Sequence, residues 1–263
     1  MKITLDASKN AQENAADYYS RASKHKAKAD GARKALENTL KEIEREKRRE
    51  QYAGPVEPPA KKKARIRREL EWFERYRWFY TSSGLLVIAG RDASQNELIV
   101  SRHGEKGDLF FHADVHGAPA TILKGGDEKA GQQDRKEAAQ FAVSYSSAWK
   151  NGAGSADTYC VPIDQVSKQA KAGEYVAKGG FIIKGKREYF KNTELGLAIG
   201  IDEKKRIVAL PQTCQRPLEK KVRISPGNVE KGEIAKKISV QLGEGNLDEI
   251  LLVLPAGKTS IVR

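Results

Sequence analysis

The sequence predicts an α+β protein in which an N-terminal antiparallel coiled-coil hairpin precedes a mixed α+β domain. Three observations support this fold class. An apolar repeat of about 3.5 residues continues for about five heptads from Ala11. A stretch rich in proline then interrupts it, and short apolar runs interspersed with helical segments begin at Gly84. We therefore expect a hairpin over residues 1–78 and a compact domain over residues 79–263, with a C-terminal extension over residues 218–263.

Residues 7–50 form the longer predicted helix of the hairpin, with Asp6 as its expected N-cap. They contain no proline and a single glycine, Gly31. The seam consists mainly of alanine, so a partner helix can approach closely but buries little apolar surface in each turn. Because the second helix is shorter, residues 7–32 lack a partner within the hairpin. We expect them to pack on the following domain, on a second copy in a homodimer, or on a segment upstream of this chain.

The stretch "YAGPVEPPAKKK" contains three prolines and one glycine, and it predicts the hairpin tip at about residues 53–60. The second helix is expected over residues 61–80. It begins with six cationic residues in eight and has no acidic residue before Glu69. A solvated helix face normally mixes positive and negative side chains. We interpret these cations as a contact to phosphates. They are Lys61, Lys62, Lys63, Arg65, Arg67 and Arg68.

The segment "WFERYRWFY" at residues 72–80 is unusually rich in aromatic residues. On a helix, Trp72, Tyr76 and Phe79 would share one face. Such a cluster either stacks on nucleic-acid bases or anchors the end of the helix in the core of the next domain. The anchoring interpretation is favoured.

The compact domain is predicted from apolar runs and amphipathic stretches that follow Gly84. The expected strands are "LLVIAG", "DLFFHAD", "APATILK", "ADTYCVP", "GGFIIKG", "LGLAIGI", "RIVALP" and the basic "KKVRIS". The expected helices are "SQNELIVSRHG" and the ranges 133–149 and about 228–242. Strands grouped around a few helices indicate an α+β arrangement rather than a regular alternation.

Composition narrows the class of protein and of partner. The net charge is +13, and residues 1–78 carry 21 Lys and Arg against 13 Asp and Glu, so a polyanion is the expected partner. Cys160 and Cys214 are far apart and in no paired motif, which predicts reduced thiols. No signal peptide and no long apolar run are present, so we expect no membrane span and a cytoplasmic location.

The motif "HADVHG" at residues 112–117 is the strongest candidate for chemistry. On a strand, His112, Asp114 and His116 would share one face, a spacing that in principle suits zinc and a metal-dependent hydrolase. No HExxH motif or cysteine cluster supports that hypothesis. The rival interpretation is a loop, turned at Gly117, that presents its side chains to the ribose and phosphate groups of a ligand. We favour the loop and expect no catalytic residue, metal or cofactor.

The stretch "GGFIIKGKR" contains a GxxxxGK pattern, but Arg187 stands where a nucleotide-binding P-loop needs Ser or Thr. "FIIK" also resembles a strand more than a phosphate-binding loop. The strand would carry Lys184, Lys186, Arg187 and Tyr189 to a turn, and cations beside an aromatic ring are typical of RNA contacts. A solvated hairpin tip explains the same residues.

Four stretches taken together resemble a known family. They are "WFERYRWFYTSSGLLVIAGRDASQNELIVSRH", "KGDLFFHADVHGAPATILK", "AVSYSSAWK" and "QVSKQAKAGEYVAKGGFIIKGKREYF". They are similar, in order, to the NFACT-R domain of the NFACT proteins, the RqcH- and NEMF-like ribosome quality-control factors that are also labelled fibronectin-binding-A-like. The N-terminal "ITLDASKNAQENAADYYSRA" resembles the middle coiled coil of that family, and the C-terminal stretches look most like archaeal members.

The resemblance implies a non-enzymatic RNA-binding module. It would bind the large ribosomal subunit, with its rRNA and tRNA, at stalled nascent chains and support C-terminal alanine tailing for degradation. The NFACT-N half of the family is absent from this sequence, and it would lie in a longer chain or a separate subunit. A coiled-coil scaffold or adhesin is the remaining alternative. With the basic stretch, the implied RNA-binding residues are Lys61, Lys62, Lys63, Arg65, Arg68, Arg91, Asn96, His112, Asp114, His116, Gln165, Lys168, Lys184, Lys186 and Arg187.

Overall fold

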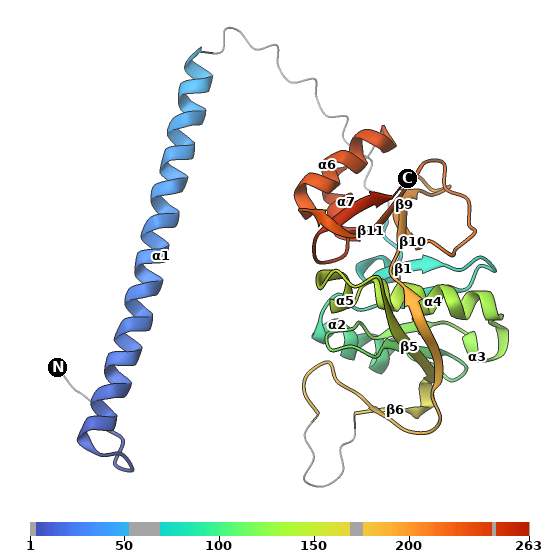
Figure 1. Ribbon diagram of the computed structural model, residues 1–263, viewed down its shortest axis with the longest axis horizontal. Coiled ribbons are helices and arrows are strands. Elements are labelled where there is room, and N and C mark those ends of the chain that lie inside the picture. Colours follow the sequence, from blue (N-terminus) through green and yellow to red (C-terminus); the bar gives the residue numbers. More distant parts are fainter. Residues whose placement is uncertain (1–3, 53–68, 169–175, 244–245, 263) are drawn as a thin grey trace. The chain divides into compact units, whose positions relative to one another are not determined.

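The computed structural model describes residues 4–52, 69–168, 176–243 and 246–262, and the chain divides into two compact units, Met1–Arg68 and Glu69–Arg263 (Figure 1). The division therefore falls at residue 68 and not at residue 78. It falls earlier because residues 72–80 contribute a turn and a strand to the second unit. The predicted α+β class is confirmed: an N-terminal helix is followed by antiparallel sheets with helices packed on them.

The first unit contains one long helix, α1 (Ala11–Tyr52), which confirms the first predicted helix. Its N-cap is Asn10 and not Asp6. The Asn10 side chain accepts a hydrogen bond from the Glu13 N–H at 2.8 Å, and the Glu13 carboxylate accepts one from the Asn10 N–H at 2.9 Å. This capping box satisfies two N–H groups at the helix end at once. Asp6 instead accepts from the N–H and the hydroxyl of Ser8.

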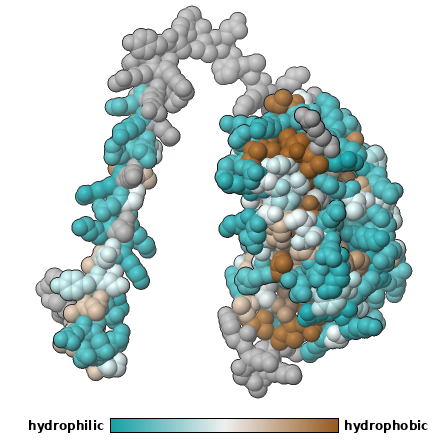
Figure 2. All heavy atoms as spheres, in the orientation of Figure 1, coloured by the Kyte–Doolittle hydropathy of each residue, from teal (hydrophilic) through white to brown (hydrophobic). Residues whose placement is uncertain are grey.

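The surface of α1 is polar, as Figure 2 shows for its visible face. Leu36, Leu40 and Ile43 are nevertheless about half exposed or more, at 62%, 54% and 46%. The predicted hairpin tip and the basic start of the second helix, residues 53–68, lie outside the described residues. None of the helices in the described residues combines the length and apolarity that crossing a bilayer requires.

The predicted second helix is wrong over residues 72–80. Residues Trp72–Arg75 form a 3-10 turn, and Arg77–Tyr80 form strand β1. Phe73 and Tyr76 pack in one hydrophobic cluster and Phe79 in another. The two clusters lie on opposite faces of a sheet, and a turn followed by an alternating strand can supply both faces. The anchoring role predicted for these aromatic residues is correct except at Trp72, which is 41% exposed.

Strand β1 is the edge of a six-stranded sheet in the order β1-β2-β4-β3-β5-β8, in which every described pairing is antiparallel. The other strands are β2 (Leu86–Ala89), β3 (Leu109–Ala113), β4 (Thr121–Leu123), β5 (Ser155–Pro162) and β8 (Glu188–Glu194). Four of the eight predicted strands thus fall in this sheet, as β2, β3, β4 and β5. The predicted "GGFIIKG" strand shortens to β7 (Ile182–Ile183), whose one pairing among the described residues is with β6 (Val166–Ser167).

Helical segments connect these strands. They are α2 (Ala93–Leu98), a π-helical turn (Ile99–His103), α3 (Gly126–Lys129), α4 (Gln132–Ser144), α5 (Ser147–Lys150) and a 3-10 turn (Ile163–Gln165). The predicted helix over 133–149 is therefore two helices. The break lies at Ser146, whose side chain accepts from the Ala148 N–H and caps the second helix.

The C-terminal part forms a second antiparallel sheet in the order β10-β9-β11-β12. Its strands are β9 (Leu197–Ile201), β10 (Ile207–Pro211), β11 (Lys221–Val229) and β12 (Thr259–Val262). Helix α6 (Lys231–Leu242) confirms the predicted helix over about 228–242, and α7 (Leu247–Val253) follows it. Both predicted thiols are free.

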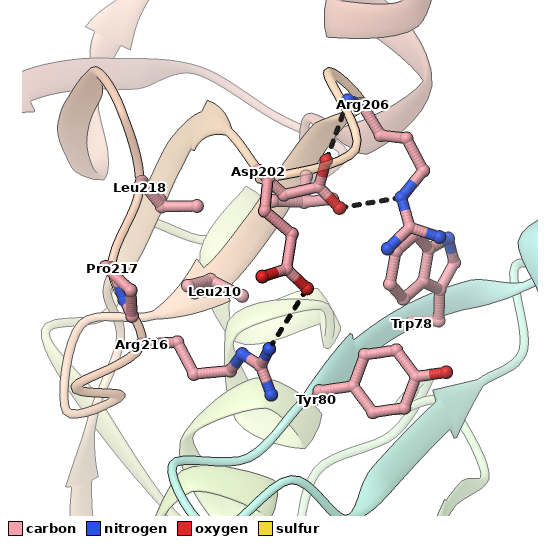
Figure 3. A pocket seen from close by; sticks show the side chains of 10 residues that line it. Trp78, Tyr80, Asp202, Arg206, Leu210, Arg216, Pro217 and Leu218 are labelled. Carbon is pink, nitrogen blue, oxygen red and sulfur yellow. Dashed lines mark hydrogen bonds and ion pairs between the residues drawn. The ribbon is translucent and has the colours of Figure 1, made fainter.

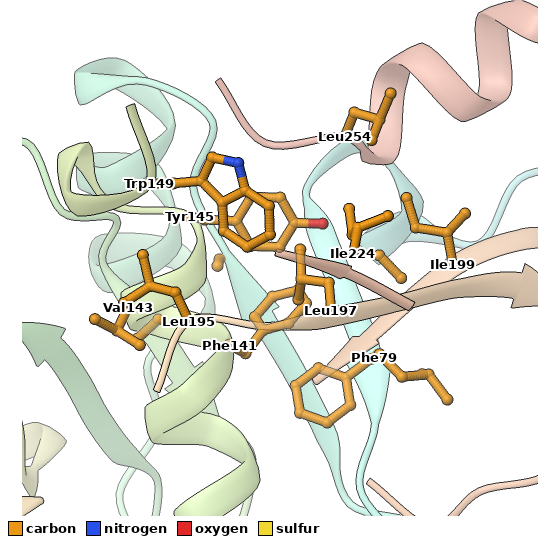
Figure 4. Close-up of a cluster of buried hydrophobic side chains, with 14 of the residues drawn as sticks. Phe79, Phe141, Val143, Tyr145, Trp149, Leu195, Leu197, Ile199, Ile224 and Leu254 are labelled. Carbon is orange, nitrogen blue, oxygen red and sulfur yellow. The ribbon is translucent and has the colours of Figure 1, made fainter. Parts of the chain in front are cut away.

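One face of the six-stranded sheet, which we call the inner face, packs on α4 and joins the second sheet in a common core (Figure 4). Phe79 and Phe141 lie 4.6 Å apart between ring centroids. The Trp149 indole N–H donates to the Thr259 hydroxyl at 3.1 Å, which ties α5 to β12. The opposite, outer face carries the smaller cluster around Phe73, Phe110 and Tyr159.

Candidate nucleic-acid interface

Three aromatic side chains form a row across one end of the outer face. His112 on β3 pairs with Tyr159 on β5, which pairs with Tyr189 on β8, so the three residues face each other across neighbouring strands. Their ring centroids are 6.0 Å and 5.9 Å apart. Tyr159 is buried, whereas Tyr189 is 42% exposed. We call His112, Tyr159 and Tyr189 the aromatic row.

Two cations lie directly on the aromatic row. The Arg187 guanidinium carbon lies 4.5 Å from the centre of the Tyr159 ring, and the Lys191 ammonium lies 4.6 Å from the centre of the Tyr189 ring. Arg187 also donates to the Tyr189 hydroxyl at 3.4 Å. Cations at these distances are attracted by the negative face of an aromatic ring. The row therefore combines ring surface and positive charge, the two features that single-stranded nucleic acids bind.

The electrostatics of the row follow from burial and from one ion pair. Burial lowers the pKa of His112 and raises the pKa of Tyr159, so both rings are neutral near pH 7. The hydrogen bond from Lys191 to Asp157, 2.6 Å long, raises the pKa of Lys191 and lowers that of the carboxyl. The row thus presents neutral aromatic rings beside fixed cations.

The "HADVHG" motif does not lie on one strand face, as the metal hypothesis required, and instead forms the turn at Gly117 that the sequence favoured. Strand β3 ends at Ala113, and the chain then turns, with Gly117 at a φ of +77°. Asp114 and His116 are exposed on this turn, whereas His112 is partly buried in the row. The Ser147 hydroxyl donates to the His116 carbonyl and ties the turn to α5. Within the described ranges, no three His, Cys, Asp or Glu side chains gather as a metal site.

The basic turn that carries Lys184, Lys186 and Arg187 bends at Gly185, which has a φ of +87°. The Gln165 carbonyl accepts from the Lys184 N–H at 2.8 Å. A side chain at position 185 would clash, because a Cβ there would lie 2.5 Å from the Gln165 side-chain oxygen. Gln165 therefore supports the turn, and Lys184 and Lys186 are exposed on it.

Three other predicted RNA-binding residues hold the fold together. Lys168 forms an ion pair with Glu97, which also accepts from the Gly179 N–H at 2.9 Å. Asn96 is buried, and its side-chain oxygen accepts from the Ala120 N–H at 3.1 Å. The Arg91 guanidinium donates to three carbonyls, which belong to Arg75, Tyr76 and Leu252. These contacts give the three side chains a structural role, and their contact to RNA stays a prediction.

Arg91 also belongs to a group that caps the C-terminal end of α7. It donates to the Leu252 carbonyl at 2.9 Å, Tyr145 to the Val253 carbonyl at 2.5 Å, and Lys231 to the Leu254 carbonyl at 3.1 Å. The last carbonyls of a helix carry partial negative charge and need donors. The capping explains why Arg91 and Lys231 are partly buried although no ion pair is described for either.

A hollow lies where β1 meets β10 and the loop before β11, and it also combines cations with aromatic rings (Figure 3). Arg206 lies 4.3 Å from the Trp78 ring and pairs with Asp202 at 2.6 Å and Glu74 at 3.2 Å. Arg216 lies 5.6 Å from the Tyr80 ring and 3.7 Å from Glu203. Acids pair with both of these guanidinium groups, whereas at the aromatic row Lys191 is paired with Asp157 and no ion pair is described for Arg187. The hollow is therefore less suited to phosphates than the aromatic row.

Sequence reasoning found part of this interface. It selected His112, Arg187 and the turn before it, but it did not select Tyr159 or Lys191 as RNA-binding residues. The alternation of Arg187, Tyr189 and Lys191 along one strand would have placed these three on one face. Tyr159 could be found only through its pairing with β3 and β8. The basic residues Lys61 to Arg68 lie outside the described residues, so their role also stays a prediction.

Comparison with known proteins identifies the second unit. Residues 75–185 match the family model described as the NFACT protein RNA binding domain. The "Archaeal Rqc2 homolog aRqcH" of Methanocaldococcus jannaschii is 41% identical over 76% of this chain. The "Ribosome quality control complex subunit NEMF homolog" of Drosophila melanogaster is 34% identical over 76% of the chain, and the human "Ribosome quality control complex subunit NEMF" 34% over 62%.

The matches cover 31%, 20% and 15% of the lengths of these three relatives, so the chain spans less than a third of each. The aromatic row begins inside the matched family stretch, at His112 and Tyr159, and continues beyond it to Tyr189. Residues 75–185 carry the RNA binding domain of the NFACT proteins, and the chain belongs to the NFACT family.

Proposed function

We propose that this chain is the RNA-binding part of a ribosome quality-control factor, and that it binds the large ribosomal subunit through rRNA or tRNA at stalled nascent chains. The observation that carries the proposal is the aromatic row with Arg187 and Lys191 in an NFACT RNA binding domain. The similarity to an archaeal Rqc2 homolog and to two ribosome quality control complex subunits supports the ribosomal context.

The chemistry of the row favours RNA over a protein partner. The exposed face of Tyr189 can stack on a base, and a base can also stack on the planar guanidinium of Arg187. Lys191 and the exposed Lys184 and Lys186 supply charge for phosphates. A surface that binds another protein would instead have an apolar centre with few charged residues.

The chain binds and positions RNA and catalyses no reaction in this proposal. Support for C-terminal alanine tailing would require the NFACT-N half, in a longer chain or as a separate subunit. The site of action is the cytoplasm, with its ribosomes. The hydrolase alternative would need a metal site, and stoichiometric zinc or manganese in the purified protein would support that alternative.

Helix α1 would supply a second contact in this assembly. Its exposed Leu36, Leu40 and Ile43 can be covered by the return helix of the hairpin, by an NFACT-N half, or by α1 of a second copy. Sedimentation equilibrium of the full chain distinguishes the homodimer from the monomer.

The direct test is cosedimentation of the full chain with purified large ribosomal subunits at low ionic strength. We expect the wild-type protein to pellet with the subunits, and the double substitution Arg187→Ser, Lys191→Ser to reduce the bound fraction at least several-fold. The control substitution is Lys236→Ser, Lys237→Ser on α6, which removes the same charge from exposed positions elsewhere. Equal binding of all three proteins would contradict the proposal.

A further inference from the structure

Two rings outside the aromatic row form an exposed stack. The Trp72 indole, in the 3-10 turn before β1, lies on the His103 imidazole at the end of the π-helical turn. Their centroids are 4.4 Å apart, and the ring planes are 21° from parallel. Trp72 is 41% exposed, whereas the neighbouring Phe73 and Tyr76 are buried. A tryptophan left half exposed beside buried aromatic residues presents costly apolar surface to water.

Contacts with Tyr76, Lys124 and Phe73 hold the stack in place. The Tyr76 hydroxyl and the His103 Nε2 lie 3.1 Å apart as hydrogen-bond partners, and the two rings meet edge to face. The Lys124 ammonium donates to the His103 carbonyl at 2.8 Å. Phe73 packs against the Trp72 ring edge to face, with centroids 5.7 Å apart. His103 covers one indole face, so a base can stack on Trp72 only from the other face.

Two exposed arginines flank this stack. Arg75 lies in the same 3-10 turn as Trp72 and Arg102 in the same π-helical turn as His103, and both side chains are exposed. Neither has an ion-pair partner in the described part of the chain. Lys124, the other nearby cation, is already paired with Asp108 at 2.7 Å and Glu105 at 3.1 Å.

We infer that the Trp72–His103 stack, flanked by Arg75 and Arg102, is a second RNA contact that receives one unpaired base on the open indole face. The guanidinium groups would bind the adjoining phosphates. The ligand class is single-stranded RNA, because a base can stack on Trp72 only when it leaves its own helical stack. Bases of every type have a flat face, so the contact is tolerant of sequence.

This inference rests on the proposed function and extends it to a separate surface. Trp72 precedes the matched stretch 75–185, so the family model assigns nothing to it. The stack shares no residue with the aromatic row. The two contacts can therefore be removed independently.

Intrinsic fluorescence gives a direct readout at the stack. Of the three tryptophans, Trp149 is buried in the core and Trp78 lies beneath the Arg206 guanidinium, so Trp72 is the most accessible to a base. We expect titration of the full chain with single-stranded oligouridylate at low salt to quench the fluorescence. The quenching should be lost in Trp72→Phe, and an equal length of fully paired RNA should not produce it.

Affinity measurements complete the test. We expect Trp72→Leu to weaken binding of the single strand about 5- to 150-fold, the range for one stacked base. The double variant Arg187→Ser, Lys191→Ser should still show the quenching, but at higher RNA concentrations than the wild-type protein. Circular dichroism confirms that each variant is folded.

Two results would overturn the inference alone: wild-type affinity in Trp72→Leu while the Arg187, Lys191 variant loses binding, or quenching that persists in Trp72→Phe. Loss of a protein contact in Trp72→Leu with unchanged RNA affinity would also overturn it, in favour of a protein-binding surface. A wild-type chain that binds neither oligouridylate nor ribosomal RNA would refute the proposed function together with this inference.

Discussion

The two faces of the six-stranded sheet are built from alternate residues of the same strands, yet they have opposite character. On β3, Phe111 points to the inner face and packs in the core with α4, whereas Phe110 and His112 point to the outer face. The inner face is closed by α4 and the second sheet. The outer face is closed by buried apolar residues at one end and carries the aromatic row at the other.

The difference shows how one strand can serve both stability and binding. On β8, Phe190 packs toward the core, 6.0 Å from Phe111, while the flanking Tyr189 belongs to the row and Lys191 lies on the Tyr189 ring. A shift of the register by one residue would exchange these faces. Binding residues on the outer face are therefore held in place by the packing of their neighbours on the inner face.

The largest expected effect is on the inner face. Phe141 is fully buried in α4 against Phe79, so Phe141→Ala removes a large apolar side chain and leaves a cavity. We expect the free energy of unfolding to fall by about 3–5 kcal/mol. Urea denaturation measures it. A loss below about 1 kcal/mol would show that the inner face is not the main source of stability.

Two adjacent residues on β8 test whether the inner face serves stability and the outer face serves binding. Tyr189→Leu should weaken RNA binding by about 1–3 kcal/mol, because a half-exposed stacking ring is lost. It should change the free energy of unfolding by no more than about 0.5 kcal/mol. Phe190→Ala should do the reverse and destabilise the fold with little change in RNA affinity per folded molecule. Fluorescence anisotropy with labelled RNA and urea denaturation measure the two quantities, and identical behaviour of the two variants would refute the division of roles.

The smallest expected effect concerns His112. Burial lowers its pKa in the folded state below the unfolded value of about 6.5. The unfolded chain then binds more protons in mildly acidic solution, so the free energy of unfolding should fall as the pH drops from 7 through the range below 6.5. His112→Asn should make this decline shallower. Denaturation at pH 7.0 and 5.5 checks it, and equal slopes for both proteins would indicate that His112 is not buried as described.

Much of the fold could be predicted from residue patterns. The 3.5-residue repeat correctly gave the long helix α1, and the apolar runs correctly placed the strands around Ile88, Phe111 and Ile199. The segment at residues 72–80 was assigned to the wrong secondary structure, because aromatic residues spaced by three and four match a helix. In the fold, Phe73 and Phe79 instead serve opposite faces of a sheet, which only the tertiary structure determines.

The candidate site was predicted less completely, for a physical reason. His112 and Arg187 were selected from local motifs, but Tyr159 enters the row only because β5 pairs with both β3 and β8. Arg91 and Asn96 matched the family pattern, yet their polar groups bind carbonyls and an N–H inside the fold. A polar residue that matches a family pattern does not by itself indicate whether its partner is the backbone or a ligand.

The central claim is that this chain binds RNA by positive charge together with stacking on exposed rings. The most direct test is the RNA affinity of the full chain as a function of salt concentration. Each phosphate contact on a single strand contributes about −0.7 to the log–log slope, so Arg187, Lys191 and their neighbours predict a slope of about −2 or steeper. A flat response, or no binding at low salt, would contradict the account.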